Sequence, residues 1–218
     1  KKCTVVDVRI KTMIVIIDYG VGNLRSILSK FERLKIEAII SSDADEIRRA
    51  DKLVFPGIGH FEASMATLGD SGLVPVLTDM VMQRKTPLLG ICLGMQLLTR
   101  GSEESPRPGL GWVAGEVKRF DFPPSSDKLL RVPHMGWNQA KFSPSSSLIT
   151  DIAPDARFYF AHSYYVVADD AEHVIGMTWY GHDFVSIIEQ GNIWATQFHP
   201  EKSHQAGLQI IRNFAQYA

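Results

Sequence analysis

The sequence has few cysteines and no long apolar run. Cys3 and Cys92 are the only cysteines among 218 residues, which gives no disulfide framework and favours a reducing, cytoplasmic compartment. The apolar runs fall short of the about 20 residues that a membrane-spanning helix needs, so we expect no membrane span.

The sequence also lacks an excess of charge of one sign. The formal net charge is −1 and lysine and arginine form no cluster, so the electrostatic footprint of a nucleic-acid-binding protein is missing. The seven histidines show no metal-ligand spacing with cysteine or carboxylates. We therefore expect neither a metal nor an organic cofactor.

An alternating α/β pattern is present instead. With 45% hydrophobic residues the chain can bury one core, and it is short for two domains. Strands alternating with helices predict a largely parallel central sheet with helices on both faces, and the strands that dominate after Gly111 add antiparallel pairs. The predicted strands are 14–18, 37–41, 52–56, 87–91, 113–120, 157–167, 173–180, 184–190 and 193–198, and the predicted helices are 24–34, 43–50 and 203–217.

A cysteine lies where the predicted strand 87–91 gives way to a helix. Cys92 stands between Gly90 and Gly94, a pattern typical of a tight strand-to-helix turn that presents a nucleophile. A helix beginning at Leu93 would direct unpaired N–H groups at the sulfur, favour the thiolate and stabilise an oxyanion. The alternative is a small buried cysteine that only packs, and the glycines alone do not decide between the two.

A second segment offers a base and a carboxylate. Residues 193–201 have the pattern of a buried strand ending in His199 and Glu201. Residues two apart in an extended chain project to the same side, so Glu201 could orient His199 toward the sulfur. A His-Pro-Glu string alone is more often a solvated loop, but with the turn at Cys92 it predicts a catalytic triad.

Both segments resemble the class I (triad-type) glutamine amidotransferases. The resemblance depends on Gly90-Ile-Cys92-Leu-Gly94-Met-Gln96 and Gln197-Phe-His199-Pro-Glu201, and it extends from Met13 to the C-terminus. It implies that Cys92 attacks the side-chain amide of glutamine and that glutamate and ammonia are released. Because the fitting hydrophobic pattern begins at Met13, we expect an amidotransferase domain over 13–218 and an extension, native or artificial, over 1–12.

The resemblance also implies an oxyanion hole and a substrate pocket. Gly57-Ile58-Gly59 matches the family's oxyanion loop, although the sequence alone favours an ordinary glycine turn there. The N–H groups of Gly59 and Leu93 are then the expected oxyanion donors. Glu104 is expected to bind the substrate ammonium, and the backbone of Ser163 and Tyr164 its carboxylate. The implied substrate-binding set is Gly57, Gln96, Glu104, Ser163 and Tyr164.

Three further segments narrow the resemblance. Residues 18–23, 133–138 and 202–203 look like those of the glutaminase subunits of imidazole glycerol phosphate synthase. This implies a heterodimer with a cyclase subunit whose fold is a (β/α)₈ barrel. That partner uses the ammonia to make imidazole glycerol phosphate and aminoimidazole carboxamide ribotide in histidine biosynthesis. Asn23, Trp137 and Lys202 are expected to face it.

Three alternatives stay open on the sequence. The first is the glutaminase subunit of anthranilate or aminodeoxychorismate synthase, which would share the triad but gives no reason for residues 133–138. The second is a free-standing γ-glutamyl hydrolase, which uses water as acceptor and needs no partner. The third, a binding module with an inactive pocket, is disfavoured by the intact Cys92, His199 and Glu201.

Overall fold

The computed structural model describes residues 12–122, 130–143 and 146–217. The predicted extension over 1–12 therefore lies, except for its last residue, outside the described residues. The boundary expected at Met13 stays a prediction.

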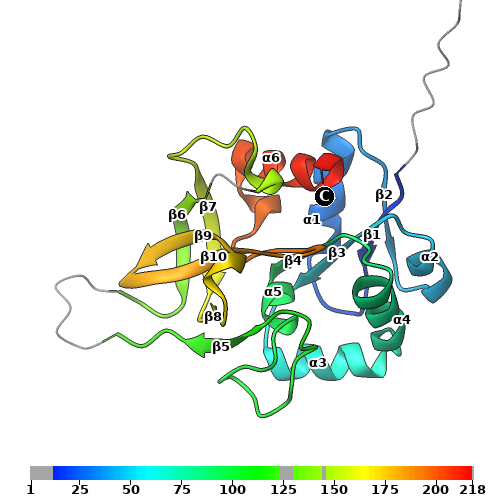
Figure 1. Cartoon of the computed structure of the whole chain (residues 1–218), viewed down its shortest axis with the longest axis horizontal. Coiled ribbons are helices and arrows are strands. Elements are labelled where there is room, and N and C mark those ends of the chain that lie inside the picture. The colour runs from blue at the N-terminus through cyan, green and yellow to red at the C-terminus, as the bar shows by residue number, and fades with distance from the viewer. Residues whose placement is uncertain (1–11, 123–129, 144–145, 218) are drawn as a thin grey trace, which may run out of the picture.

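A parallel sheet forms one half of the molecule (Figure 1). Its strand order is β2-β1-β3-β4-β11, and every neighbouring pair is parallel. Because helices cover both faces, these strands are short, continuous apolar runs. Their bounds are β1 (Ile14–Ile17), β2 (Ala38–Ser41), β3 (Lys52–Gly57), β4 (Leu88–Cys92) and β11 (Ile193–Thr196).

Antiparallel strands continue the sheet beyond β11. The order there is β10-β9-β6-β7, while β8 pairs with both β10 and β5. The bounds are β5 (Gly115–Arg119), β6 (His134–Phe142), β7 (Arg157–His162), β8 (Tyr164–Ala168), β9 (Val174–Tyr180) and β10 (His182–Gln190).

Helices cover both faces of the parallel half (Figure 1). One face carries α1 (Leu24–Arg33) and α6 (His204–Tyr217), and the other carries α2 (Ala44–Arg48), α3 (Phe61–Asp70), α4 (Val74–Thr78) and α5 (Leu93–Leu97). A π-helical turn (Asp79–Gln83) continues α4, and 3₁₀ turns occupy Ser147–Ile149, Ala171–His173 and Pro200–Lys202.

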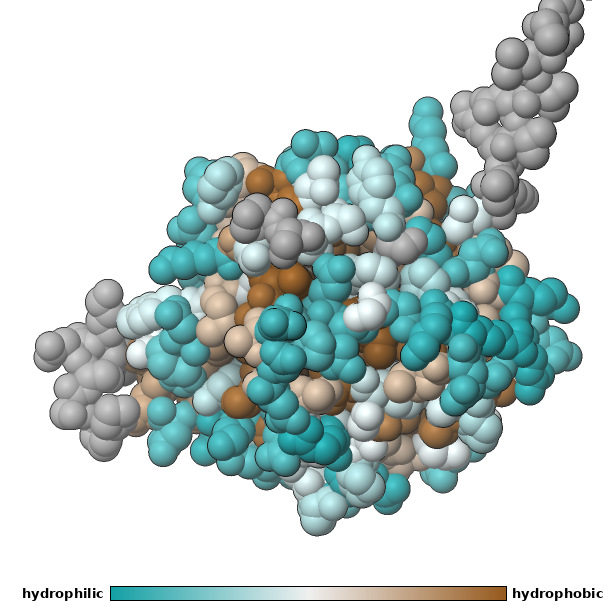
Figure 2. All heavy atoms as spheres, viewed as in Figure 1, coloured by the Kyte–Doolittle hydropathy of each residue, from teal (hydrophilic) through white to brown (hydrophobic). Residues whose placement is uncertain are grey.

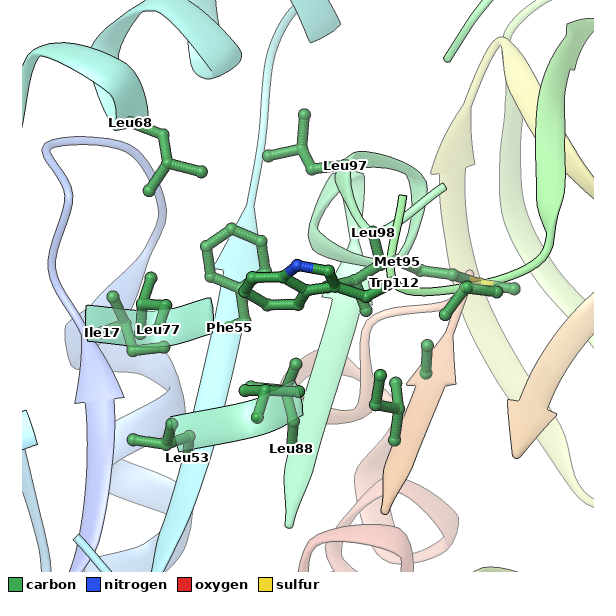
Figure 3. Close-up of a cluster of buried hydrophobic side chains, with 14 of the residues drawn as sticks. Ile17, Leu53, Phe55, Leu68, Leu77, Leu88, Met95, Leu97, Leu98 and Trp112 are labelled. Atoms are coloured by element: carbon green, nitrogen blue, oxygen red, sulfur yellow. The ribbon is translucent and has the colours of Figure 1, made fainter. Parts of the chain in front are cut away.

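The core is divided into two layers by the sheet. Along β1, Val15 and Ile17 point into the layer beneath α3 and α4, whereas Ile14 and Ile16 point into the layer beneath α1 and α6. Figure 3 shows part of the first layer, where Phe55, Leu97 and Trp112 gather between β3 and α5. Both layers pack against β4, so the end of that strand is held firmly in place.

The predicted fold class is confirmed, and several predicted bounds are wrong. The strand predicted over 157–167 is two strands, which are separated at Ser163. The strand predicted over 193–198 ends at Thr196. Strand β6 was not predicted, because Met135 and Trp137 on its outer face are exposed and the usual pattern of buried apolar residues is reversed there.

Hydrophilic residues gather over α2, at the right of Figure 2. Among the described residues, no helix is both long and apolar enough to cross a membrane.

Candidate active site

Cys92 lies at the carboxyl end of β4, directly before α5. Its backbone has φ 54° and ψ −110°, a left-handed conformation that residues other than glycine rarely adopt. A Cβ at Gly94 would collide with the carbonyl oxygen of Phe55, so glycine is required where α5 crosses β3. The predicted strand-to-helix turn is therefore present, and it holds the sulfur at the start of a helix.

His199 and Glu201 are buried beside the sulfur. The Nδ1–H of His199 donates to Oε1 of Glu201 at 2.8 Å, and His199 lines the same cavity as Cys92, whose charge acts on the imidazole. The backbone conformation predicted for this pair was wrong, because β11 ends before His199 and the backbone from His199 to Glu201 is not extended. Instead, His199 is the N-cap of the 3₁₀ turn Pro200–Lys202, and this turn brings the carboxylate of Glu201 back to the imidazole.

The electrostatics of the pair favour a protonated imidazole. Burial lowers the pKa of His199, but the negative charge on Cys92 and its hydrogen bond, together with the hydrogen bond and charge of Glu201, outweigh burial and raise the pKa to about 10. His199 therefore carries a proton at neutral pH that it can donate to a leaving group.

A cavity of about 460 Å³ opens over the sulfur, a volume that suits a ligand the size of an amino acid. Its lining combines residues from the parallel and antiparallel halves of the sheet. The lining residues are Ile58, Gly59, His60, Cys92, Leu93, Gln96, Glu104, Pro133, Met135, Ala161, His162, Ser163, Tyr164, His199 and Lys202. Every predicted catalytic, oxyanion and substrate-binding residue lines it except Glu201, which lies behind His199, and Gly57.

The two glycines of the predicted oxyanion loop serve different needs. Gly57 packs against α5, and a Cβ there would lie 2.7 Å from the amide nitrogen of Gly94. Gly59 has open space around it but a φ of +89°, so its backbone conformation favours glycine. Gly59 and Leu93 border the same cavity, whereas Gly57 shapes the wall behind it.

The carboxylate of Glu104 already has partners in this structure. Its Oε1 lies 3.0 Å from Nδ1 of His60, and its Oε2 accepts the N–H of Phe61 at 2.9 Å. A substrate ammonium would therefore compete with His60, whose side chain is 82% exposed.

Gln96 is directed at the protein rather than at open space. Its Nε2 donates to the carbonyl oxygen of Tyr164 at 2.9 Å and to Oε1 of Gln197 at 3.1 Å. Gln197 in turn donates to the sulfur of Cys92 at 3.8 Å. No role is predicted for Gln197 from the sequence, although Gln197 is the first residue of the motif that contains His199.

Two of the three predicted partner-facing residues lie against the same aromatic ring, that of Tyr159. Trp137 stacks on His204, with ring centroids 4.7 Å apart, and lies near Tyr159. The ammonium of Lys202 lies 5.7 Å above the ring of Tyr159, so Lys202 and Trp137 both contact Tyr159, and of the three only Lys202 lines the cavity. Asn23 instead caps α1, where it accepts the N–H of Ser26, and it borders a separate hollow.

Comparison with known proteins gives the class first. The family model of glutamine amidotransferase class-I matches residues 15–217. Two solved structures share the fold: a glutamine amidotransferase (TM-score 0.68, 19% identity, 92% of this chain and 96% of that one) and PurLQS from Thermotoga maritima (TM-score 0.68, 16% identity, 95% and 99%). The chain is thus an enzyme of the class-I glutamine amidotransferase family.

Curated relatives narrow the class. The imidazole glycerol phosphate synthase subunit HisH 2 of Methanococcus maripaludis is 44% identical over 94% of this chain and 100% of its own length. The HisH subunit of Leptospira borgpetersenii is 42% identical over 93% of this chain and 99% of its own length. HisH 2 of Pseudomonas aeruginosa is 44% identical over 94% of this chain and 99% of its own length. Within its class, the chain belongs to the HisH family, as the resemblance predicted.

Proposed function

We propose that this chain hydrolyses glutamine with a Cys92-His199-Glu201 triad and passes the ammonia to a cyclase subunit. The observation that carries the proposal is the arrangement around the sulfur. A cysteine in a left-handed conformation lies directly before a helix and lines one cavity with a buried histidine, and the Nδ1–H of that histidine donates to a buried carboxylate at 2.8 Å.

The reaction follows from these positions. The sulfur of Cys92 attacks the side-chain amide carbon of glutamine, and the N–H groups of Gly59 and Leu93 stabilise the resulting oxyanion. His199 donates its proton to the departing nitrogen, which leaves as ammonia. Water, deprotonated by His199, then attacks the glutamyl thioester, the C–S bond breaks, and glutamate leaves with the Cys92 thiolate and the protonated His199 restored. Glu201 keeps the imidazole oriented in both steps.

Glutamine is held by groups at the edge of the cavity. The substrate ammonium binds Glu104 in place of His60, and the substrate carboxylate meets the backbone of Ser163 and Tyr164 between β7 and β8. A site built from fixed charges of both signs rejects analogues that leave one of them unpaired. Gly57 contributes by letting the oxyanion loop approach α5 rather than by contact with the substrate.

The partner is a cyclase subunit with a (β/α)₈ barrel, bound as a heterodimer. Free ammonia is soon protonated in water and then loses its nucleophilicity, so its transfer needs a covered route. Ile58 and Met135 are exposed apolar residues that line the cavity, and Trp137 is exposed on the same strand as Met135, which suits a docking surface there. The names of the relatives support an imidazole glycerol phosphate synthase complex with a role in histidine biosynthesis. We extend the proposal to aminoimidazole carboxamide ribotide as the second product and to a cytoplasmic location. Asn23 stays a predicted contact.

Glutamate release from glutamine tests the proposal. It is measured for the chain alone, for the chain with a cyclase subunit that carries its ribotide ligand, and for the same mixture with Cys92→Ala. We expect a large increase on mixing and no turnover with Cys92→Ala.

Full turnover by Cys92→Ala would contradict the triad. Equal turnover with and without the cyclase would contradict the proposal that a cyclase is the partner, and it would favour a γ-glutamyl hydrolase. An increase with the synthase component of anthranilate synthase instead would favour that alternative, for which the names of the relatives give no support.

A further inference from the structure

A hydrogen-bonded network of two buried histidines and a half-buried asparagine ends at the carbonyl oxygen of Tyr164. Nδ1 of His162 lies 2.7 Å from that oxygen, and Nε2 of the same ring lies 3.1 Å from Nδ1 of His134. Nε2 of His134 lies 3.4 Å from the side-chain nitrogen of Asn138. His134 and His162 are 3% and 6% exposed, so the hydrogen bond between the two rings is shielded from water. None of the three side chains has a role in the triad.

The direction of each hydrogen bond in the network of His162, His134 and Asn138 is fixed. A carbonyl oxygen only accepts, so His162 carries its proton on Nδ1 and accepts at Nε2, and His134 must then donate from Nδ1. The amide of Asn138 is oriented by Gln139, whose N–H donates to Oδ1, and by the carbonyl oxygen of Trp179, which accepts from Nδ2. Both rings therefore have one permitted tautomer.

Both imidazoles are neutral at physiological pH. Burial lowers the pKa of His134 to about 4. The pKa of His162 is lowered to about 3, and burial is the largest cause. Each ring therefore has one donor and one acceptor nitrogen, as the chain requires.

The carbonyl of Tyr164 joins this chain to the nucleophile. The same oxygen accepts from Gln96 at 2.9 Å, Gln96 donates to Gln197, and Gln197 donates to the sulfur of Cys92. A shift of this carbonyl would therefore change the position of Gln96 and of the 163–164 backbone.

We propose that His134 and His162 are positioning residues that hold the Tyr164 carbonyl, and with it the glutamine-binding segment, in register with strand β6. The proposal rests on the proposed function, because it assigns the carboxylate of glutamine to Ser163 and Tyr164. His134 and His162 face each other across β6 and β7. Met135 and Trp137 are exposed on the same strand, so a partner that contacts them also contacts the strand that carries His134.

Two substitutions of His134 separate hydrogen bonding from packing. His134→Phe keeps a ring between Phe160 and Tyr180, whose centroids lie 4.8 and 4.0 Å away, but removes the donor to His162. His134→Asn loses the ring but keeps an N–H near the position of Nδ1. His182→Phe is the matched control: its ring belongs to the same aromatic cluster, and its buried Nε2 has no hydrogen-bond partner among the described residues.

Glutamine binding is measured by calorimetry in the Cys92→Ala background, which prevents turnover. We expect His134→Phe to raise the Kd for glutamine by about tenfold, the equivalent of about 1.4 kcal/mol, because the Nε2 atom of His162 is left buried without a donor. We expect His134→Asn to restore most of the affinity and His182→Phe to leave it unchanged. The opposite order, with Phe tolerated and Asn harmful, would show that the ring only packs and would overturn the proposal.

Nitrogen NMR of labelled histidines tests the chain without any substitution of His134. We expect both rings to be neutral with the proton on Nδ1 near neutral pH. A proton on Nε2 of His162, or a doubly protonated ring, would overturn the proposal. If the Cys92→Ala parent failed to bind glutamine, the proposed function would be contradicted, and the tautomers would still decide whether the histidine chain exists.

Discussion

At the scale of single residues, the pH dependence of catalysis depends on Glu201. Its hydrogen bond and charge are among the causes that raise the pKa of His199 from 6.5 to about 10, so the imidazolium persists as the pH rises and is lost only toward that value. Glu201→Gln removes the charge. We expect the alkaline limb of kcat/KM for glutamine to move to lower pH and kcat to fall by less than it does in Cys92→Ala. An unmoved alkaline limb would mean that Glu201 does not support the protonated base.

The backbone at Cys92 makes a second prediction about one residue. A non-glycine residue with φ 54° and ψ −110° carries strain of about 1–3 kcal/mol. We expect Cys92→Gly to have a higher free energy of unfolding than Cys92→Ala in urea titrations, although both lose turnover. If the alanine variant were the more stable, the nucleophile would not be held under strain.

The sequence predicts residue identities better than residue contacts. Cys92, His199 and Glu201 could be named because each lies in a recognisable local motif. The bond between His199 and Glu201 was assigned to an extended strand, but a 3₁₀ turn forms it. Contacts such as His134 with His162 join segments 28 residues apart and follow no local periodicity, so they emerge only when β6 pairs with β7.

At the scale of elements, the crossing of α5 over β3 sets the position of the nucleophile. A Cβ on Gly94 would meet the Phe55 carbonyl, which is backbone and cannot rotate away. We expect Gly94→Ala to lower the free energy of unfolding by about 1–3 kcal/mol and to reduce turnover. Gly101→Ala is the control, because its Cβ would have no neighbour within 4 Å. Equal unfolding midpoints for the two variants would contradict this tight crossing.

The strands of the parallel half were predictable, whereas helices α3 and α4 were not predicted. The strands of the parallel half are apolar on both faces, so their sequence shows them directly. Strand β6 exposes Met135 and Trp137 and buries His134, and this reversal conceals it. The break at Ser163 between β7 and β8 is likewise invisible in a run of aromatic residues, yet it supplies the backbone proposed to bind glutamine.

At the scale of the whole molecule, the candidate site forms where the two halves of the sheet meet. The parallel half supplies Cys92, the antiparallel half supplies Ser163 and Tyr164, and the segment after β11 brings His199 between them. Neither half contains a complete site. A change in how the halves pack therefore reaches the chemistry directly, which is the property that a partner-controlled glutaminase needs.

The partner surface can be tested on the same scale. Met135 is 64% exposed and lines the mouth of the cavity. A carboxylate placed there would be buried without a partner in the complex but solvated in the free chain. We expect Met135→Glu to weaken cyclase binding by at least about tenfold in calorimetry, with the thermal unfolding of the chain unchanged. Val167→Glu, at an exposed position of β8 that does not line the cavity, should bind like the parent. Unchanged binding by Met135→Glu would move the docking surface away from the cavity mouth, and the hollow beside Asn23 would then be the next place to substitute.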